Sequence, residues 1–187
     1  MCFSSKGTGD IYIKAECGMI VSETYGIVDA IYANSTETTL PTVSGSGNKI
    51  LTLDNNLSLT LPSSFELTYT IKTSFNSVRF GIVPVANKSN KDPNYSVFGQ
   101  QTSNQYVGVY RDTSVHAVGS DTSTTGTSYH NWKIKRTNDT FQWYFDNVQI
   151  NSDVTLSWFD TYTPHTIACQ YWSNGTAKVK DIILKAL

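Results

Sequence analysis

The stretch 131–150 constrains the fold more than any other part of this chain. It reads NWKIKRTNDTFQWYFDNVQI and alternates apolar with polar residues in two runs. Such alternation predicts β-strands, because successive side chains of a strand point to opposite faces of a sheet. Asn138 and Asp139 between the runs favour a tight turn, and Asp146 with Asn147 predicts a second turn. The stretch therefore predicts a three-stranded meander, whose aromatic face needs a second sheet to cover it.

Similar runs recur along most of the chain. The cleanest is 65–72, where aromatic and aliphatic residues alternate with Glu, Thr and Lys. Hairpins are expected over 49–61 and over 166–184, because each range holds two apolar runs around an Asn-containing turn. Only 156–162 suggests a helical turn. Further short strands are expected at 11–13, 19–21, 27–32, 78–85, 96–98, 105–111 and 114–118, the last three pairing in sequence.

About a dozen short strands with polar connections and no fixed repeat predict an all-β fold. The expected architecture is a two-sheet antiparallel β-sandwich of jelly-roll topology. Pro84 should confine its strand to a sheet edge or end there. We expect the sandwich to span residues 27–187, with 1–26 as an N-terminal arm or junction and a loop over 33–48 that includes one strand step at Val43.

The charge pattern argues against two classes of partner. The chain has 14 basic and 15 acidic residues, a net charge of −1, and no cluster of Lys or Arg along the sequence. Nucleic acid and anionic membranes are bound through such clusters, so neither partner is expected. Charged residues make up 16% of the chain, below the roughly 25% of typical soluble domains, so hydroxyl and amide groups should dominate the surface.

The cysteines and the start of the chain carry no strong signal. Cys2, Cys17 and Cys169 are far apart, without a CxxC motif or a nearby His pair, which predicts neither a disulfide framework nor a zinc site. No loop shows the ligand pattern of a calcium site, so we expect no metal and no cofactor. The first ten residues lack the features of a secretory signal, and no run is long enough to span a bilayer, so no export address is expected.

The order of several motifs resembles a known family. FELTYTIKT, FGIVPV and YVGVYRD precede the meander, and GTAKVKDIILKAL follows it. This order is similar to that of concanavalin A-like and laminin-G-like jelly rolls. It also resembles the lectin-like modules of bacteriophage and archaeal-virus tail or fibre proteins, which share a W-K-I-x-R strand, an aromatic strand ending in a D-N or D-G turn, and a terminal V-K-x-I strand. The resemblance implies a jelly roll over 27–187, a fold that hosts lectins, hydrolases and structural proteins alike.

Two catalytic patterns are missing from the sequence. Hydrolases of this fold resemble one another in a Glu-x-Asp-x-x-Glu strand, because glycosidic cleavage needs two carboxylates about 5 Å apart. The chain lacks this motif, and no nucleophile elbow or catalytic cysteine signature surrounds any of its three histidines. We therefore expect no catalytic residue and no enzyme activity. The glutamates are scattered, at Glu16, Glu23, Glu37 and Glu66.

Sugar recognition needs flat aromatic faces beside amides and carboxylates that bond hydroxyl groups in pairs. Such residues occur in and beside the polar loops. Ligand contacts are expected from Asp92, Asn94, Tyr95, Gln101, Asn104, Tyr106, Tyr110, Arg111 and Trp172. Tyr106 and Tyr110 share a face with Gly108 between them. That face points either outward, leaving a gap for a ligand, or inward, where the opposite sheet fills the gap.

The leading hypothesis is a non-enzymatic, lectin-like receptor-recognition module of a viral fibre or tail protein that binds a cell-surface glycan. Such a module would lie on the virion surface after assembly in the host cytoplasm, contact other virion subunits and form a homotrimer. One alternative is a structural virion protein, such as a head fibre, baseplate or decoration protein, whose aromatic residues bind protein neighbours. Another is an extracellular fragment of a cell-surface adhesin, and a glycan-degrading enzyme comes last.

Overall fold

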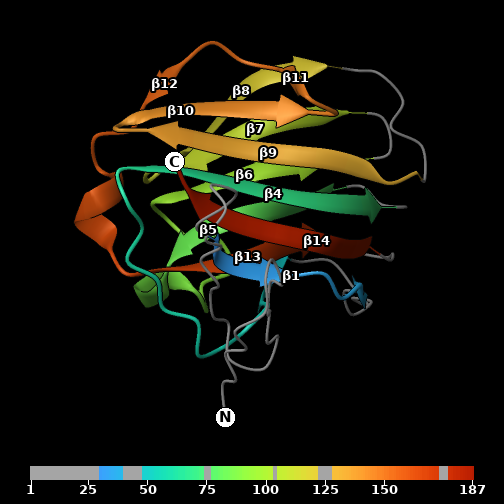
Figure 1. Cartoon of the computed structure of the whole chain (residues 1–187), viewed down its shortest axis with the longest axis horizontal. Coiled ribbons are helices and arrows are strands. Elements are labelled where there is room, and N and C mark those ends of the chain that lie inside the picture. The colour runs from blue at the N-terminus through green and yellow to red at the C-terminus, as the bar shows by residue number, and fades with distance from the viewer. Residues whose placement is uncertain (1–29, 40–47, 74–76, 103–104, 122–127, 173–176) are drawn as a thin grey trace, which may run out of the picture.

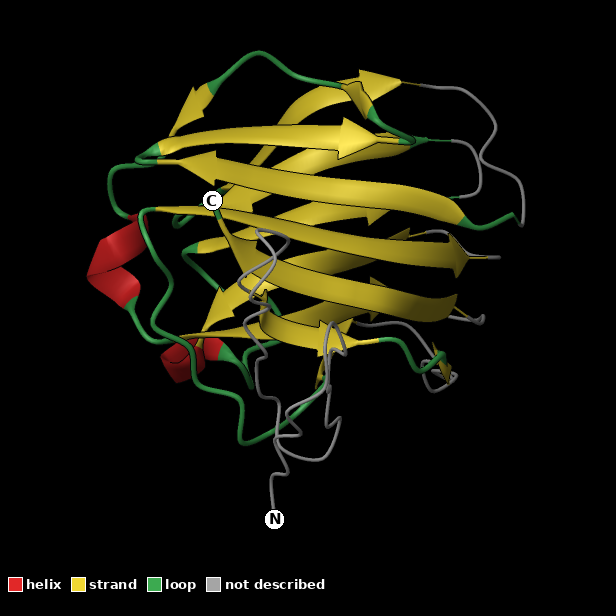
Figure 2. Cartoon of the chain, viewed as in Figure 1, coloured by secondary structure: helices red, strands yellow, loops and turns green. Residues whose placement is uncertain are grey.

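Two antiparallel β-sheets pack face to face in the described part of the protein (Figures 1 and 2). The structure is a computed structural model that describes residues 30–39, 48–73, 77–102, 105–121, 128–172 and 177–187. The predicted all-β sandwich is therefore confirmed. Within these ranges two short 3-10 helices accompany the strands, η1 (Val85–Asn87) and η2 (Phe159–Tyr162), and the second of them lies within the predicted helical turn.

The larger sheet has eight strands and faces the viewer in Figure 1. Six of them form a continuous path, in the order β1 (Ala30–Asn34), β14 (Ala177–Ala186), β4 (Ser64–Thr73), β9 (His130–Thr137), β10 (Thr140–Phe145) and β11 (Val148–Gln149). Two short strands lie beside this path, where β2 (Thr38–Thr39) pairs with β14 and β12 (Val154–Thr155) pairs with β10.

The smaller sheet has six strands and lies behind the first in Figure 1. Its order is β3 (Asn48–Thr52), β13 (His165–Trp172), β5 (Ser77–Pro84), β6 (Ser96–Gln101), β7 (Tyr106–Arg111) and β8 (Val115–Asp121). The expected sequential pairing of β6, β7 and β8 is confirmed. The strand β5 ends at Pro84, as its missing N–H group predicts.

Alternation along the strands builds the core between the sheets. Every second residue of β4, from Phe65 to Thr73, is buried, and its other residues are partly exposed on the outer face. Buried aromatic side chains also join the two sheets by hydrogen bonds. The Tyr69 hydroxyl donates to the Phe80 carbonyl oxygen at 3.0 Å, and the Trp143 indole N–H donates to the Phe98 carbonyl oxygen at 2.8 Å. These bonds satisfy the polar end of each ring where water is absent.

The predicted meander is confirmed as β9, β10 and β11. Its turns use left-handed backbone at the expected residue types, with φ of 54° at Asn138, 46° at Asp146 and 69° at Asn147. Asn and Asp tolerate this conformation better than other residues with a side chain. The local sequence therefore predicts this part of the fold completely.

Both predicted long hairpins are wrong. Over 49–61 only β3 is a strand, and it pairs with β13, while Leu59 makes an isolated bridge with His165. Over 166–184 the two strands exist, but β13 belongs to the six-stranded sheet and β14 to the eight-stranded sheet. The physical reason is that both strands bury apolar faces across the core, so they face each other instead of lying side by side.

One end of the core holds a buried charge. The side chain of Arg136 is 1% exposed and donates to both carboxylate oxygens of Asp160, each at 2.7 Å. Its guanidinium lies 4.9 Å from the centre of the Phe159 ring. The same Phe159 ring stacks on the ring of His165, with centroids 4.2 Å apart. These contacts fix η2 against the core.

Several expectations lie outside the described residues. They are the strands at 11–13 and 19–21, the strand step at Val43, and the arm over 1–26 with its boundary at residue 27. Within the described ranges, no helix is both long and apolar enough to cross a membrane. Cys169 is a buried free thiol, and no group of three or more His, Cys, Asp or Glu side chains there could hold a metal ion.

Candidate functional site

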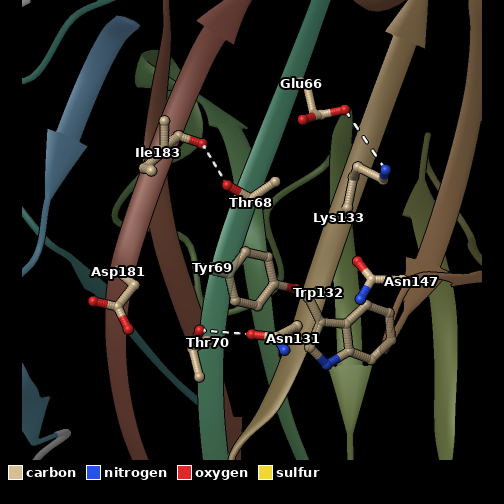
Figure 3. A pocket seen from close by; sticks show the side chains of 10 residues that line it. All are labelled: Glu66, Thr68, Tyr69, Thr70, Asn131, Trp132, Lys133, Asn147, Asp181 and Ile183. Carbon is tan, nitrogen blue, oxygen red and sulfur yellow. Dashed lines mark hydrogen bonds and ion pairs between the residues drawn. The ribbon is translucent and has the colours of Figure 1, made fainter. Parts of the chain in front are cut away.

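A hollow of about 350 Å³ lies on the outer face of the eight-stranded sheet (Figure 3). Its floor is made by β4, β9 and β14. Tyr69 and Trp132 border it, but their side chains are buried in the core, so the main chain forms the floor there. The side chains around it are polar except for one, Ile183. The full lining is Glu66, Thr68, Tyr69, Thr70, Asn131, Trp132, Lys133, Asn147, Asp181 and Ile183.

A β-bulge in β14 shapes one side of the hollow. Lys180 pairs with Thr70 and Ile183 pairs with Thr68, so β14 has one residue more than β4 between these pairs. Asp181 lies in the bulge with a φ of 51°, and its carboxylate is 3.4 Å from the Lys180 ammonium group. A bulge of this kind redirects a side chain and often lies next to a binding site.

Hydrogen bonds and ion pairs fix the other side chains. Glu66 is only 15% exposed and lies between two ammonium groups, 3.7 Å from that of Lys133 and 3.2 Å from that of Lys185. The Thr70 hydroxyl donates to the Asn131 side-chain oxygen at 2.9 Å. Because these side chains stand on strands and hold one another, the hollow is organised before any ligand arrives.

The hollow can bond hydroxyl groups. It presents carboxylates, amides, threonine hydroxyls and an ammonium group within one concave surface. Ile183 adds methyl groups, and it is one of four large apolar side chains exposed in the described part of the chain. Beside the hollow, Lys133 lies 4.3 Å from the centre of the Tyr144 ring, which places an aromatic side chain on the same face.

Sequence reasoning missed most of this site. It placed Glu66 on the outer face of its strand but expected the ligand on the loops of the other sheet. One signal was present, because alternation along the last strand breaks between Lys180 and Ile183, where Asp181 stands. An interrupted alternation predicts a bulge. The gathering of β4, β9 and β14 could not be read from local patterns.

Three of the expected site residues do come together on the opposite outer face. Arg111 donates through Nε to the Asn94 side-chain oxygen at 2.8 Å, and its Nη1 is 3.9 Å from an Asp92 carboxylate oxygen. Gln170 donates to Asp92 at 2.9 Å. Burial lowers the pKa of the neighbouring Arg79 to about 10, and Asp92 partly opposes this. These polar groups satisfy one another and tie the segment after η1 onto the six-stranded sheet.

Tyr95 stands next to that network with a φ of 59°. Its ring stacks on Tyr162 with centroids 3.5 Å apart and meets Trp158 edge-on at 5.6 Å. The stack covers one face of each tyrosine, so these rings pack on each other at the end of the sandwich.

The remaining expected residues are buried, packed inward or outside the described side chains. Gln101 is 1% exposed and accepts a hydrogen bond from the Trp132 indole, so it is not on a surface loop as expected. Tyr106 stacks on Phe145 at 3.8 Å, and Tyr110 packs against the same core. Asn104 and the side chain of Trp172 lie outside the described part.

The inward alternative therefore holds for the face shared by Tyr106, Gly108 and Tyr110. A Cβ added at Gly108 would lie 2.7 Å from the Cγ atom of Trp143, which belongs to the opposite sheet. The gap between the two tyrosines is thus filled by the core and not open to a ligand.

Comparison with known proteins supports the fold. No family model and no curated protein matches this sequence. Among solved structures, the carbohydrate-binding module CBM66 from Bacillus subtilis superposes with a TM-score of 0.56 at 11% identity, covering 82% of this chain and 97% of the module. An endo-β-1,3-glucanase from Pyrococcus furiosus gives a TM-score of 0.54 at 13% identity, over 73% of this chain and 65% of the enzyme.

A family 7 alginate lyase, A1-II′, gives a TM-score of 0.52 at 10% identity, over 89% of this chain and 85% of the lyase. The chain is therefore a jelly-roll β-sandwich, and the predicted resemblance to concanavalin A-like jelly rolls is confirmed for the fold. Nothing in these comparisons concerns a viral tail or fibre. At such identities the similarity covers the fold alone and carries no residue role across.

The expectation that this chain is not an enzyme is wrong as a conclusion. It rested on missing catalytic motifs, whereas the solved structures with this fold include an alginate lyase, an endo-β-1,3-glucanase and the catalytic domain of a laminarinase. A fold shared by binding modules and catalytic domains is compatible with both functions.

Proposed function

We propose that this protein binds carbohydrate in the hollow on the outer face of β14, β4 and β9. The observation that carries the proposal is the lining of that hollow. Carboxylate, amide, hydroxyl and ammonium groups are fixed around a volume of about 350 Å³, close to the lower limit of roughly 300 Å³ for small-molecule sites. That size suits one or two sugar rings.

The chemistry of the lining matches that of a sugar. A sugar ring presents hydroxyl groups at its edge and C–H groups on its faces, so it needs paired donors and acceptors together with an apolar contact. Glu66, Asp181 and Asn131 supply the polar partners, and Ile183 supplies exposed methyl groups. The similarity in fold to a carbohydrate-binding module, over 97% of that module, supports the same proposal.

The biological setting remains a prediction. A receptor-recognition module of a viral fibre, with glycan on the host surface and virion subunits as partners, is consistent with a carbohydrate-binding sandwich. A structural virion protein and an extracellular adhesin fragment are the alternatives. Trimer formation, location on the virion surface and the absence of nucleic acid or membrane partners stay predictions as well.

The proposal is tested on a glycan array with matched variants. Asp181→Asn removes one carboxylate from the hollow, and Asn tolerates the left-handed backbone at this position. Asp92→Asn makes the same change on the opposite outer face. Losing a hydrogen bond to a charged group costs about 1.5–3 kcal/mol, so Asp181→Asn should weaken binding at least about tenfold.

The Asp92→Asn variant should bind like the wild type. Loss of binding in Asp92→Asn alone would move the site to the loop network around Arg111 and refute the proposed location. A blank array with all three folded proteins would refute carbohydrate binding itself.

A further inference from the structure

Lysines gather on the outer face that holds the hollow. Six of the 14 basic residues of the chain lie at outward positions of β4, β9 and β14. They come from segments far apart in a sequence of net charge −1, so the fold creates this charged face. The six are Lys72, Lys133, Lys135, Lys178, Lys180 and Lys185.

Three of these lysines form a compact group next to the hollow. Lys72 and Lys178 are direct partners in the pairing of β4 with β14, and Lys180 follows two residues later on the same face. The ammonium groups of Lys72 and Lys180 lie 4.6 Å and 4.9 Å from the centre of the Tyr129 ring. We call Lys72, Lys178 and Lys180 the lysine triad. Like charges directly opposite each other destabilise a sheet, so an anion bound between them would reduce this electrostatic repulsion.

The described residues supply only part of the negative charge that the lysine triad needs. Glu37 accepts hydrogen bonds from Lys178 and from the Tyr129 hydroxyl. The bond to Glu37 raises the pKa of Tyr129 to about 12, so the tyrosine stays neutral and adds no negative charge.

Over β4, β9 and β14, and counting described residues alone, the six lysines meet three carboxylates, those of Glu37, Glu66 and Asp181, which leaves three positive charges. Two further carboxylates, on Asp146 and Asp153, are bonded to His130 of β9 and Gln142 of β10. The lysine triad itself meets two of these carboxylates, those of Glu37 and Asp181, so one positive charge remains there.

The lysine triad continues the hollow along the strands. Thr70 and Asp181 line the hollow, Lys72 follows two residues after Thr70, and Lys180 directly precedes Asp181. Two residues of a strand span about 7 Å, roughly the length of one sugar unit. A saccharide that places one ring in the hollow would thus bring a substituent of the next ring to the lysine triad.

We propose that the ligand is an acidic polysaccharide, with one sugar in the hollow and a carboxylate or sulfate group of the adjoining sugar bound by the lysine triad. This inference rests on the proposed function and names the class of glycan. It concerns charge complementarity between the ligand and one defined face of the protein.

Nucleic acid fits the same face less well. Regularly spaced phosphates along these strands would meet the carboxylates of Glu66 and Asp181 among the lysines. Arginine makes the bidentate contacts that dominate recognition of phosphate and guanine. The arginines of the chain lie elsewhere, with Arg79 and Arg111 on the other sheet and Arg136 buried.

Matched polysaccharides test the inference with the full chain. Polygalacturonate is compared with its methyl ester, and dextran sulfate with dextran, so that each pair differs only in charge. We expect the charged member of at least one pair to bind about tenfold or more tightly at roughly 50 mM salt, and much of this advantage to disappear at roughly 200 mM. The pair that shows the effect identifies carboxylate or sulfate as the anion.

Variants connect the effect to the lysine triad. Lys72→Gln combined with Lys180→Gln should abolish the preference for the charged member. The double variant Lys88→Gln and Lys91→Gln, which removes two charges from the segment around η1, should keep it. The variant that carries Lys72→Gln and Lys180→Gln should melt at a temperature no lower than that of the wild type, because Lys72 lies directly opposite Lys178 and the two like charges repel. An unlowered melting temperature shows that this variant is folded.

Three results would overturn the inference in distinguishable ways. Equal binding of charged and uncharged members refutes the acidic class but leaves carbohydrate binding intact. No binding to any saccharide, here and on the array, refutes carbohydrate binding and the inference with it. Binding of a single-stranded oligonucleotide through the lysine triad, more tightly than any polysaccharide, would assign this face to nucleic acid instead.

Discussion

Acid should destabilise this protein through the buried histidine His165. The ring is 1% exposed, stacks on Phe159, and has no hydrogen-bond partner for either nitrogen among the described residues. Burial lowers the pKa of His165 from 6.5 to about 4, with Asp160 opposing the shift and Arg136 adding to it. The folded protein therefore resists a proton that the unfolded chain accepts.

The sign and the size of the effect follow from this difference. Above the unfolded pKa of 6.5 both states are neutral and the stability is complete. As the pH falls toward 4, the unfolded state gains a proton that the folded state lacks, and stability decreases by about 1.4 kcal/mol per pH unit. The total loss from His165 between these limits is about 3 kcal/mol.

Urea unfolding followed by tryptophan fluorescence measures the effect, because Trp132 and Trp143 are buried. The free energy of unfolding is determined at about pH 7.5, 6.5, 5.5 and 4.5 for the wild type and for His165→Leu, which keeps an apolar side chain but cannot titrate. The variant should lose most of the slope in this range. Equal slopes in the two proteins would show that His165 is not the titrating group and refute the reasoning.

Three further changes test the packing. Gly108→Ala forces a Cβ to within 2.7 Å of Trp143, so it should lower the free energy of unfolding by about 1–3 kcal/mol, and an unchanged value would contradict the inward face of β7. Asp160→Asn leaves buried Arg136 without its bidentate partner. Because the Asp160 side chain is 61% exposed, we expect the free energy of unfolding to fall by only about 1–3 kcal/mol in the same assay. A fall below about 0.5 kcal/mol would contradict a stabilising role for this ion pair. Burial raises the pKa of the Cys169 thiol. In a variant whose other two cysteines are replaced by serine, a thiol reagent should therefore react with Cys169 only when urea unfolds the protein. Rapid reaction of the native protein would contradict the burial of this thiol.

Local patterns predict those parts of the fold that depend on local interactions. The alternation over 65–72 becomes β4, and the meander follows its turn residues closely, since Asn138, Asp146 and Asn147 all adopt left-handed backbone. Side-chain alternation and turn preference act over a few residues, so the sequence displays them directly.

Pairing between distant segments could not be predicted in the same way. The strands β13 and β14 are separated by a short connection that looks like a hairpin turn, yet they enter different sheets. The partner of each strand is decided by which arrangement buries the apolar faces of the whole chain, and no local signal records it. The hairpin over 49–61 failed for the same reason.

The candidate site depends on such distant pairing. Lys72, Lys133 and Lys178 are scattered in sequence, so the charge pattern showed no cluster, although the pairing of β4 with β9 and β14 brings all three to one face. Conversely, Gln101 lay in a segment that looked like a polar loop, but it belongs to β6 and is buried. The alternation over 105–111 predicted a strand without deciding which way Tyr106 faces, and the opposite sheet decides it. A surface formed by several strands is visible only once their order is known.

The most direct test of the central claim maps the ligand onto the protein. A ¹H–¹⁵N spectrum is titrated with the saccharide that binds most tightly on the array. Carbohydrate binding in the hollow predicts shifts that saturate together at the amides of Thr68, Asn131, Lys133 and Asp181. Shifts confined to the segment 92–95, on the opposite outer face, would contradict the account.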